Sequence, residues 1–167
     1  MKCKIVKLHK FSGKKASIYT IYIDDKNTTL FDIFVRENLN SSKSEILNIL
    51  NRLSVIGKET GARGQFFKHW EGAPGDGLSA LYDDPEKKLR LYCIRYGSGI
   101  LILGGGGPKP KNIHALQEDE KLIHENGILK KMSQEITQRI KNRDITFSNS
   151  GSEFLGDLEF DDHEEDE

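Results

Sequence analysis

Three short apolar runs lie close together in the middle of this 167-residue chain, and they constrain its fold more than any other feature. They cover residues 78–82, 89–96 and 100–103. An Asp-Asp-Pro-Glu stretch separates the first two and a Gly-Ser-Gly stretch the last two, and both have the length and residue types of hairpin turns. Because strands joined by such short connections pair as antiparallel neighbours, the sequence predicts a three-stranded antiparallel meander.

Strand and helix patterns surround this meander. Strands are expected at 3–8 and 16–24, which would form an additional N-terminal hairpin. Helical spacing predicts helices at 30–35, at 43–56 and, beyond the meander, at 114–126 and 128–141. Ser42 and Glu45 fit a capping box before the second helix, Gly57 fits its end, and Asn126 with Gly127 predicts a break between the last two. We therefore expect an α+β domain over residues 1–145, with the antiparallel meander packed against helices.

Charge is distributed very unevenly along the chain. The whole chain has 25 basic and 26 acidic side chains, for a net charge of -1. Nine of the acids and none of the bases lie in 153–167, so residues 1–152 carry a net charge of +8. A basic body suggests nucleic acid as a partner. Residues 146–167 read as an acidic, mostly disordered tail.

Several protein classes are excluded by composition. No apolar run approaches the ~20 residues of a membrane span, and the N-terminus lacks the apolar stretch of a signal peptide. Cys3 and Cys93 are too few and too far apart for a disulfide framework or a thiol metal site, and the histidines have no metal-ligand spacing. We expect a cytoplasmic protein that uses no metal and no cofactor.

Four consecutive glycines at 104–107, followed by Pro-Lys-Pro-Lys, suggest a phosphate-binding loop but do not fit one. Such a loop needs a helix that starts at the lysine, which Pro108 and Pro110 oppose. Two interpretations remain open. Either the glycines only bend the chain out of the sheet, or they allow close backbone approach while Lys109 and Lys111 supply charge for a phosphate.

Basic residues cluster around the predicted sheet. Arg90 and Arg95 lie in the middle strand, on opposite faces unless the strand bulges or ends between them. The others precede or follow the meander: Arg63, Lys68, Lys109, Lys111 and His114. Metal-free RNA cleavage needs such a set: a base for the 2′-hydroxyl, cations for the phosphorane and an acid for the leaving oxygen. The competing interpretation is that these charges only keep the sheet soluble.

Tyr92 adds an aromatic side chain to the same strand. It either packs within the sheet or offers a ring on which a base could stack. The RNA-binding candidates are therefore Arg63, Lys68, Arg95 and Tyr92.

The order of strand, two helices, meander and C-terminal helix resembles the RelE/ParE/HigB toxin superfamily. The resemblance rests on Lys-Leu-Arg-Leu-Tyr-Cys-Ile-Arg-Tyr at 88–96, on the Gly-Ser-Gly turn, and on the apolar strand and Lys-rich loop that follow. It covers about residues 30–125. It implies a small cytoplasmic toxin that cleaves mRNA, often on the ribosome, and that a neighbouring antitoxin protein inhibits.

Residue roles follow from the same resemblance. Arg90 matches the strand arginine at the scissile phosphate, Lys109 and Lys111 match the basic loop, and His114 lies where an acid is often found. The expected function is a toxin-type, metal-independent endoribonuclease. The alternative is a non-catalytic module, with a degenerate RelE-like fold, that binds RNA, the ribosome or a protein. The tail 153–167 either solubilises the chain or covers the region of Arg90 and Lys109 as a nucleic-acid mimic.

Overall fold

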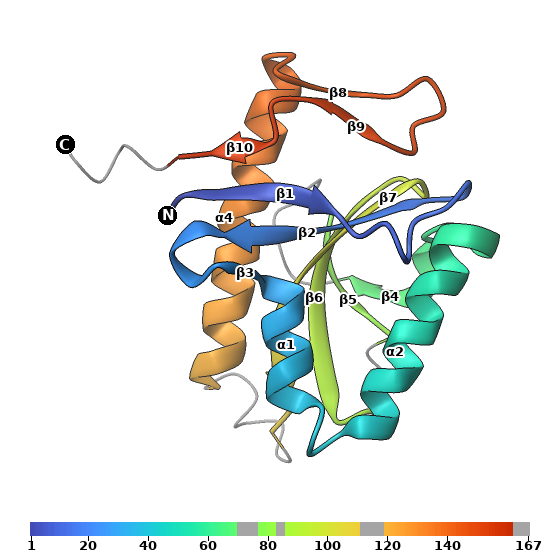
Figure 1. The fold of residues 1–167 in the computed structure, drawn as a ribbon, viewed down its shortest axis with the longest axis vertical. Coiled ribbons are helices and arrows are strands. Elements are labelled where there is room, and N and C mark those ends of the chain that lie inside the picture. Colours follow the sequence, from blue (N-terminus) through green and yellow to red (C-terminus); the bar gives the residue numbers. More distant parts are fainter. Residues whose placement is uncertain (70–76, 83–85, 111–118, 162–167) are drawn as a thin grey trace.

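A mostly antiparallel eight-stranded sheet forms the centre of the computed structural model, which describes residues 1–69, 77–82, 86–110 and 119–161 (Figure 1). The strand order is β10-β1-β2-β7-β6-β5-β4, and β3 pairs with β2 beside this path. The strands are β1 (Cys3–Lys7), β2 (Ser17–Ile23), β3 (Thr28–Thr29), β4 (Phe67–His69), β5 (Leu78–Leu81), β6 (Leu89–Tyr96), β7 (Ile100–Pro108) and β10 (Glu159–Phe160). A separate two-stranded sheet pairs β8 (Ile145–Phe147) with β9 (Phe154–Gly156).

The predicted meander and N-terminal hairpin are both confirmed. β5, β6 and β7 pair antiparallel in sequence, and β1 pairs antiparallel with β2. The hairpin joins the meander through a parallel pairing of β2 with β7, in which Ser17–Thr20 lie beside Ile100–Leu103. β2 is buried along almost its whole length, as expected for a strand with neighbours on both sides and helices on both faces.

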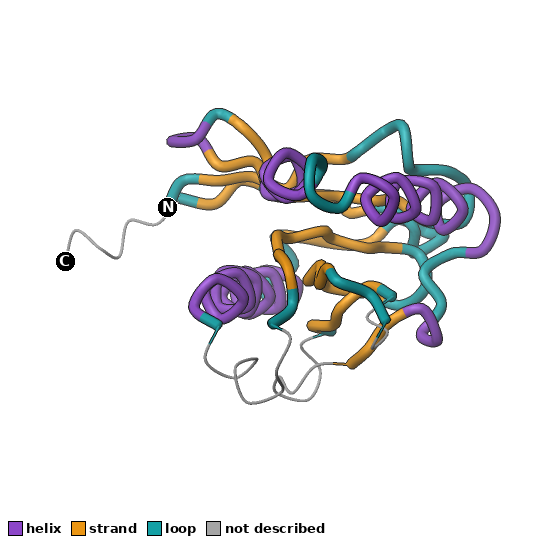
Figure 2. Tube along the Cα trace, turned by 90° about the horizontal axis from the view of Figure 1, so that it is seen from below, coloured by secondary structure: helices purple, strands orange, loops and turns teal. Residues whose placement is uncertain are grey.

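Helices cover both faces of the sheet (Figure 2). α1 (Leu30–Asn38) and α2 (Lys43–Val55) pack on one face, and α4 (Glu120–Lys141) packs on the other. Short helical turns occur at Asp24–Lys26, Ile56–Thr60 and Gly64–Phe66. Alternation along β6 divides the core accordingly: Leu89, Leu91 and Cys93 face α1 and α2, while Tyr92 and Ile94 face α4.

The ends of α2 differ from the predicted capping pattern. Ser42 makes no side-chain capping bond. The Glu45 carboxylate instead accepts hydrogen bonds from the backbone N–H groups of Leu89, at 2.9 Å, and Lys88, at 3.2 Å. At the other end the chain continues as a π-helical turn through Gly57, where a Cβ would lie 1.8 Å from the Phe11 carbonyl oxygen. Glu45 therefore joins α2 to the start of β6.

One interpretation of the sequence predicted that the glycine run bends the chain out of the sheet, and this is wrong. β7 continues through Gly104–Gly107 to Pro108 and stays paired with β6, with a register irregularity between Leu91 and Cys93. The glycines serve close packing, because α4 crosses directly above them. A Cβ on Gly104 would lie 2.9 Å from Leu129, and one on Gly105 would lie 2.3 Å from Glu125.

The predicted helix break at Asn126 and Gly127 is wrong. α4 runs without interruption from Glu120 to Lys141. A glycine inside an exposed helix surface costs about 1 kcal/mol relative to alanine. Burial of Leu129, Met132 and Ile136 against the sheet offsets that cost.

Residues 145–160 are also folded, in contrast to the disorder expected from residue 146 onward. They form β8, β9 and β10, and β10 pairs with β1. The apolar members Ile145, Phe154 and Phe160 are buried in the cluster beneath α4. The core thus extends past the predicted domain end at residue 145, while residues 162–167 lie outside the described part.

Within the described residues, none of the helices combines the length and apolar character that crossing a bilayer requires.

Candidate nucleic-acid interface

The pairing of β6 with β7 brings two of the predicted phosphate ligands to the same patch of sheet. Arg90 lies opposite Gly107, and the Lys109 N–H donates to the Lys88 carbonyl oxygen at 2.7 Å. Residues two positions apart on a strand share a face, so Lys88, Arg90 and Lys109 all lie on the face that α4 covers. Lys88 is exposed and Lys109 half-buried.

Lys68 belongs to the same face, one strand beyond β5. It pairs with Ala80, which pairs in turn with Tyr92. The Lys68 side chain is exposed. We call Lys68, Lys88, Arg90 and Lys109 the basic sheet face. Lys111 and His114, the other predicted catalytic residues, lie outside the described residues.

Arg90 is the buried member of the basic sheet face. Only 2% of its surface is exposed, and it makes interactions within the fold. A guanidinium in such a place carries a charge that burial makes costly unless it is paired. A phosphate would reach it only if the groups around it moved apart.

Tyr92 is buried as well. It is 2% exposed and packs in the core cluster between the sheet and α4. In this arrangement its ring has no surface on which a base could stack, so packing is the role that the geometry gives it.

Arg95 and Arg63 stand apart from the basic sheet face. Arg95 Nε donates to the Ala62 carbonyl oxygen at 2.6 Å, and its guanidinium lies 5.8 Å from the centre of the Phe67 ring. These contacts fasten β6 to the 62–67 segment on the face of α1 and α2. Arg63 is exposed in that segment. The predicted RNA-binding residues are therefore divided between two faces of the sheet.

An ion-paired cluster, which the sequence analysis missed, joins α1 to α4 above the glycine run. Lys121 Nζ lies 3.1 Å from Glu37 Oε1 and 3.4 Å from Glu125 Oε1. Burial alone would lower the pKa of the Lys121 ammonium, but hydrogen bonds and charge attraction from both carboxylates outweigh it and raise the pKa. The sequence signal was the charged spacing of residues 121 and 125, which places both on one helix face.

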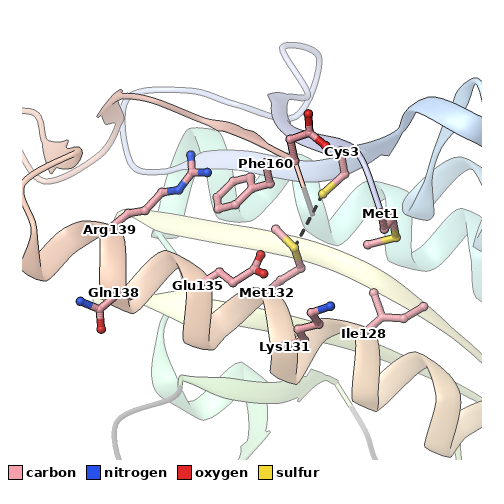
Figure 3. Close-up of a pocket in the computed structure, with 10 residues that line it drawn as sticks. Met1, Cys3, Ile128, Lys131, Met132, Glu135, Gln138, Arg139 and Phe160 are labelled. Carbon is pink, nitrogen blue, oxygen red and sulfur yellow. Dashed lines mark hydrogen bonds between the residues drawn. The ribbon is translucent and has the colours of Figure 1, made fainter. Parts of the chain in front are cut away.

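The C-terminal half of α4 borders a depression of about 380 Å³ (Figure 3). Its apolar floor includes Cys3 and Met132, whose sulfur atoms are 3.8 Å apart. Burial raises the pKa of the Cys3 thiol to about 11. This thiol is therefore protonated at neutral pH and is not an activated nucleophile.

Arg139 holds the C-terminal segment beside that depression. Its guanidinium lies 3.8 Å from the centre of the Phe160 ring and donates to the Asp157 carbonyl oxygen at 3.0 Å. Arg139 is 18 residues from Lys121 along α4, about 27 Å at 1.5 Å per residue. Residues 154–160 therefore do not cover the basic sheet face, which corrects the nucleic-acid-mimic hypothesis for this part of the tail.

The residues that the structure describes contain no group of three or more His, Cys, Asp or Glu side chains placed to hold a metal ion.

Comparison with known proteins leaves the chain without an assigned family. None of the protein-family models matches it, and neither the curated proteins nor the solved structures include a match.

Proposed function

We propose that this protein is a toxin-type endoribonuclease that acts in the cytoplasm without a metal ion or cofactor. Its substrate would be RNA, free or on the ribosome, and an antitoxin protein would restrain it. The observation that carries the proposal is the register of β6 and β7, which puts Lys88, Arg90 and Lys109 on one face of the sheet.

The arrangement around this face supports the proposal. A chain order of strand, helix pair, antiparallel meander and C-terminal helix is what the RelE-like resemblance implies. Lys68, from the far side of β5, lengthens the row of cations to a width that a nucleic-acid backbone could follow. Phosphate binding by such a row would weaken as salt concentration rises.

The chemistry of cleavage sets out what each group would do. A base removes the 2′-hydroxyl proton, O2′ attacks the phosphorus, the bond from phosphorus to O5′ breaks, and an acid returns a proton to O5′. Arg90 and Lys109 would stabilise the charge that builds on the phosphoryl oxygens. Lys111 and His114 follow Lys109 in the sequence and are the nearest further candidates for charge stabilisation and for the acid. The product of this reaction is a 2′,3′-cyclic phosphate.

Induced expression in a bacterium, with mapping of RNA ends, tests the proposal. We expect growth arrest and RNA fragments with 2′,3′-cyclic phosphate ends, formed equally well in EDTA. Lys109→Ala should relieve the arrest, whereas Lys130→Ala, which removes an exposed cation from α4, should not. Arg90→Ala is informative only where circular dichroism shows a folded protein, because Arg90 is buried.

The burial of Arg90 favours a second candidate, a non-catalytic module that binds RNA, the ribosome or a protein. In that case wild type and Lys109→Ala would both leave growth and RNA intact. Salt-dependent RNA binding, weakened by Lys68→Ala and Lys109→Ala, would remain.

A further inference from the structure

A cavity of about 140 Å³ is lined by residues of α1, α4 and the glycine run. Gly105 and Gly106 line it, and the side chains of Ile33, Phe34 and Ile128 give it apolar walls. Water occupies about 30 Å³ per molecule in the liquid, so this space exceeds what one ordered water would fill. Gly105 and Gly106 lie beyond the pairing of β7 with β2, which ends at Leu103.

Glu125, which lines this cavity, carries a buried carboxylate oxygen without a hydrogen-bond partner. Glu125 is 8% exposed; its Oε1 is close to Lys121, but no described residue forms a hydrogen bond with its Oε2. This oxygen lies against Gly105, where a Cβ would be only 2.3 Å away. An unsatisfied buried acceptor costs more when it is charged. The position therefore favours a ligand that brings hydrogen-bond donors.

The lining of the cavity also supplies the complementary donors. Lys26 and Lys121 line it together with Glu125, and a lysine ammonium is a hydrogen-bond donor only. One ligand could donate to Glu125 and accept from a lysine ammonium.

We propose that this cavity binds a guanine base. Guanine carries two adjacent donors, N1–H and the N2 amino group, which suit the two oxygens of a carboxylate. The acceptor O6 lies beside N1 and suits a lysine ammonium. Adenine and cytosine present a ring acceptor in place of the N1–H donor, and uracil lacks the adjacent amino group. Recognition of single-stranded RNA commonly uses this edge of an unstacked base.

The cavity is accessible and close to the basic sheet face. Glu37 and Lys121, whose ion pair borders it, are each more than 40% exposed in their side chains, and such a pair costs little to open. Lys109 directly follows the end of β7 and lies three residues beyond Gly106, about 10 Å at 3.3 Å per residue. A dinucleotide could thus place a base over Gly106 and a phosphate at Lys109. The role of the cavity in selecting RNA rests on the proposed function. Its preference for guanine over other bases does not, and can be tested separately.

Titration of ¹⁵N-labelled protein with nucleosides tests the proposal without any RNA chemistry. Guanosine should shift the amide signals of Gly105 and Gly106, and bind about tenfold more tightly than inosine, which lacks the N2 amino group, or adenosine. Glu125→Gln should lose this preference. Glu135→Gln, on the same helix but outside the cavity, should keep it.

The outcomes separate this proposal from the proposed function. Equal or undetectable shifts with guanosine and adenosine would overturn the guanine site. If the protein then still cleaves RNA, whatever the base, the proposed nuclease function stands. Guanosine binding at Gly105 and Gly106 in a protein that never cleaves RNA would support the site and overturn the nuclease.

Discussion

Alanine at Gly106 should strongly destabilise the fold, whereas alanine at Gly107 should not. A Cβ on Gly106 would lie 1.8 Å from the Arg90 carbonyl oxygen, and contacts closer than 3.0 Å are essentially never seen. The backbones of β6 and β7 would have to separate locally by about 1.2 Å, and overpacking of this kind costs about 3 kcal/mol. At Gly107 the nearest atom is Cε of the flexible Lys121 side chain, at 3.5 Å. The lost backbone freedom of the unfolded chain should make that variant more stable, by about 0.5 kcal/mol.

Urea unfolding followed by circular dichroism measures both effects. With an m-value of about 2 kcal/mol/M, Gly106→Ala should lower the midpoint by about 1.5 M relative to wild type. Its melting temperature should fall by about 6–12 °C. Gly107→Ala should unfold at or slightly above the wild-type midpoint. Equal midpoints for the two variants would refute the register of β7 over the glycine run, because the contrast depends only on which glycine faces the β6 backbone.

Three further predictions concern other parts of the fold. Burial raises the pKa of the Cys3 thiol to about 11 and that of Cys93 to about 12, so a thiol reagent at pH 8 should modify neither in native protein and both in urea. The hydrogen bond and charge of Lys7 lower the pKa of Glu153 below its usual 4.5. The contribution of this pair to stability should therefore be complete above pH 4.5 and fall as the pH drops through the lowered pKa. Acid titrations should show this loss in the wild type and not in Glu153→Gln. Arg139→Ala should cost about 2 kcal/mol and increase hydrogen exchange across 154–160, and unchanged exchange there would contradict its role as the fastener of this segment.

The sheet could be predicted where clear turn signals join consecutive strands, but the short strands β3 and β4 were not predicted. Residues 78–103 carry their own turn signals, and the meander follows from them. The parallel contact of β2 with β7 joins residues 83 positions apart, and no local pattern marks it. The glycines that line the cavity lie just beyond that contact, so the sequence could not reveal the cavity.

The glycine run shows why a local rule can mislead. Glycine weakens an isolated strand, which favours an end to β7 at Leu103. Here another element requires the missing side chains, because the Leu129 and Glu125 side chains of α4 occupy the space that a Cβ on Gly104 or Gly105 would take. Close approach by another part of the chain was one of the two interpretations of the glycines, but no local pattern identifies α4 as the approaching element.

The C-terminal segment shows the opposite error. Its acidic composition favours disorder, yet Phe154 and Phe160 are spaced to reach one apolar surface. Each buried aromatic side chain contributes about 2 kcal/mol, enough together to hold a segment whose acids remain in solvent. The prediction of disorder followed the acidic composition of the whole segment and overlooked the few apolar residues that hold it in place.

The candidate site combines a predictable part with an unpredictable one. The strand pattern indicated that Arg90 and Lys109 could lie near each other, and the pairing of Arg90 with Gly107 brings their backbones together. The charge set alone would serve any polyanion, because phosphate contacts carry no base information. Selectivity needs a shaped space with fixed donors and acceptors, and here that space is a product of tertiary structure: a strand edge left open by its parallel neighbour, and a helix that brings Glu125 onto a glycine. If both parts act on one ligand, the basic sheet face should set its affinity and the cavity its identity. Lys109→Ala should then weaken all RNA ligands alike, and Glu125→Gln should weaken only those that contain guanine.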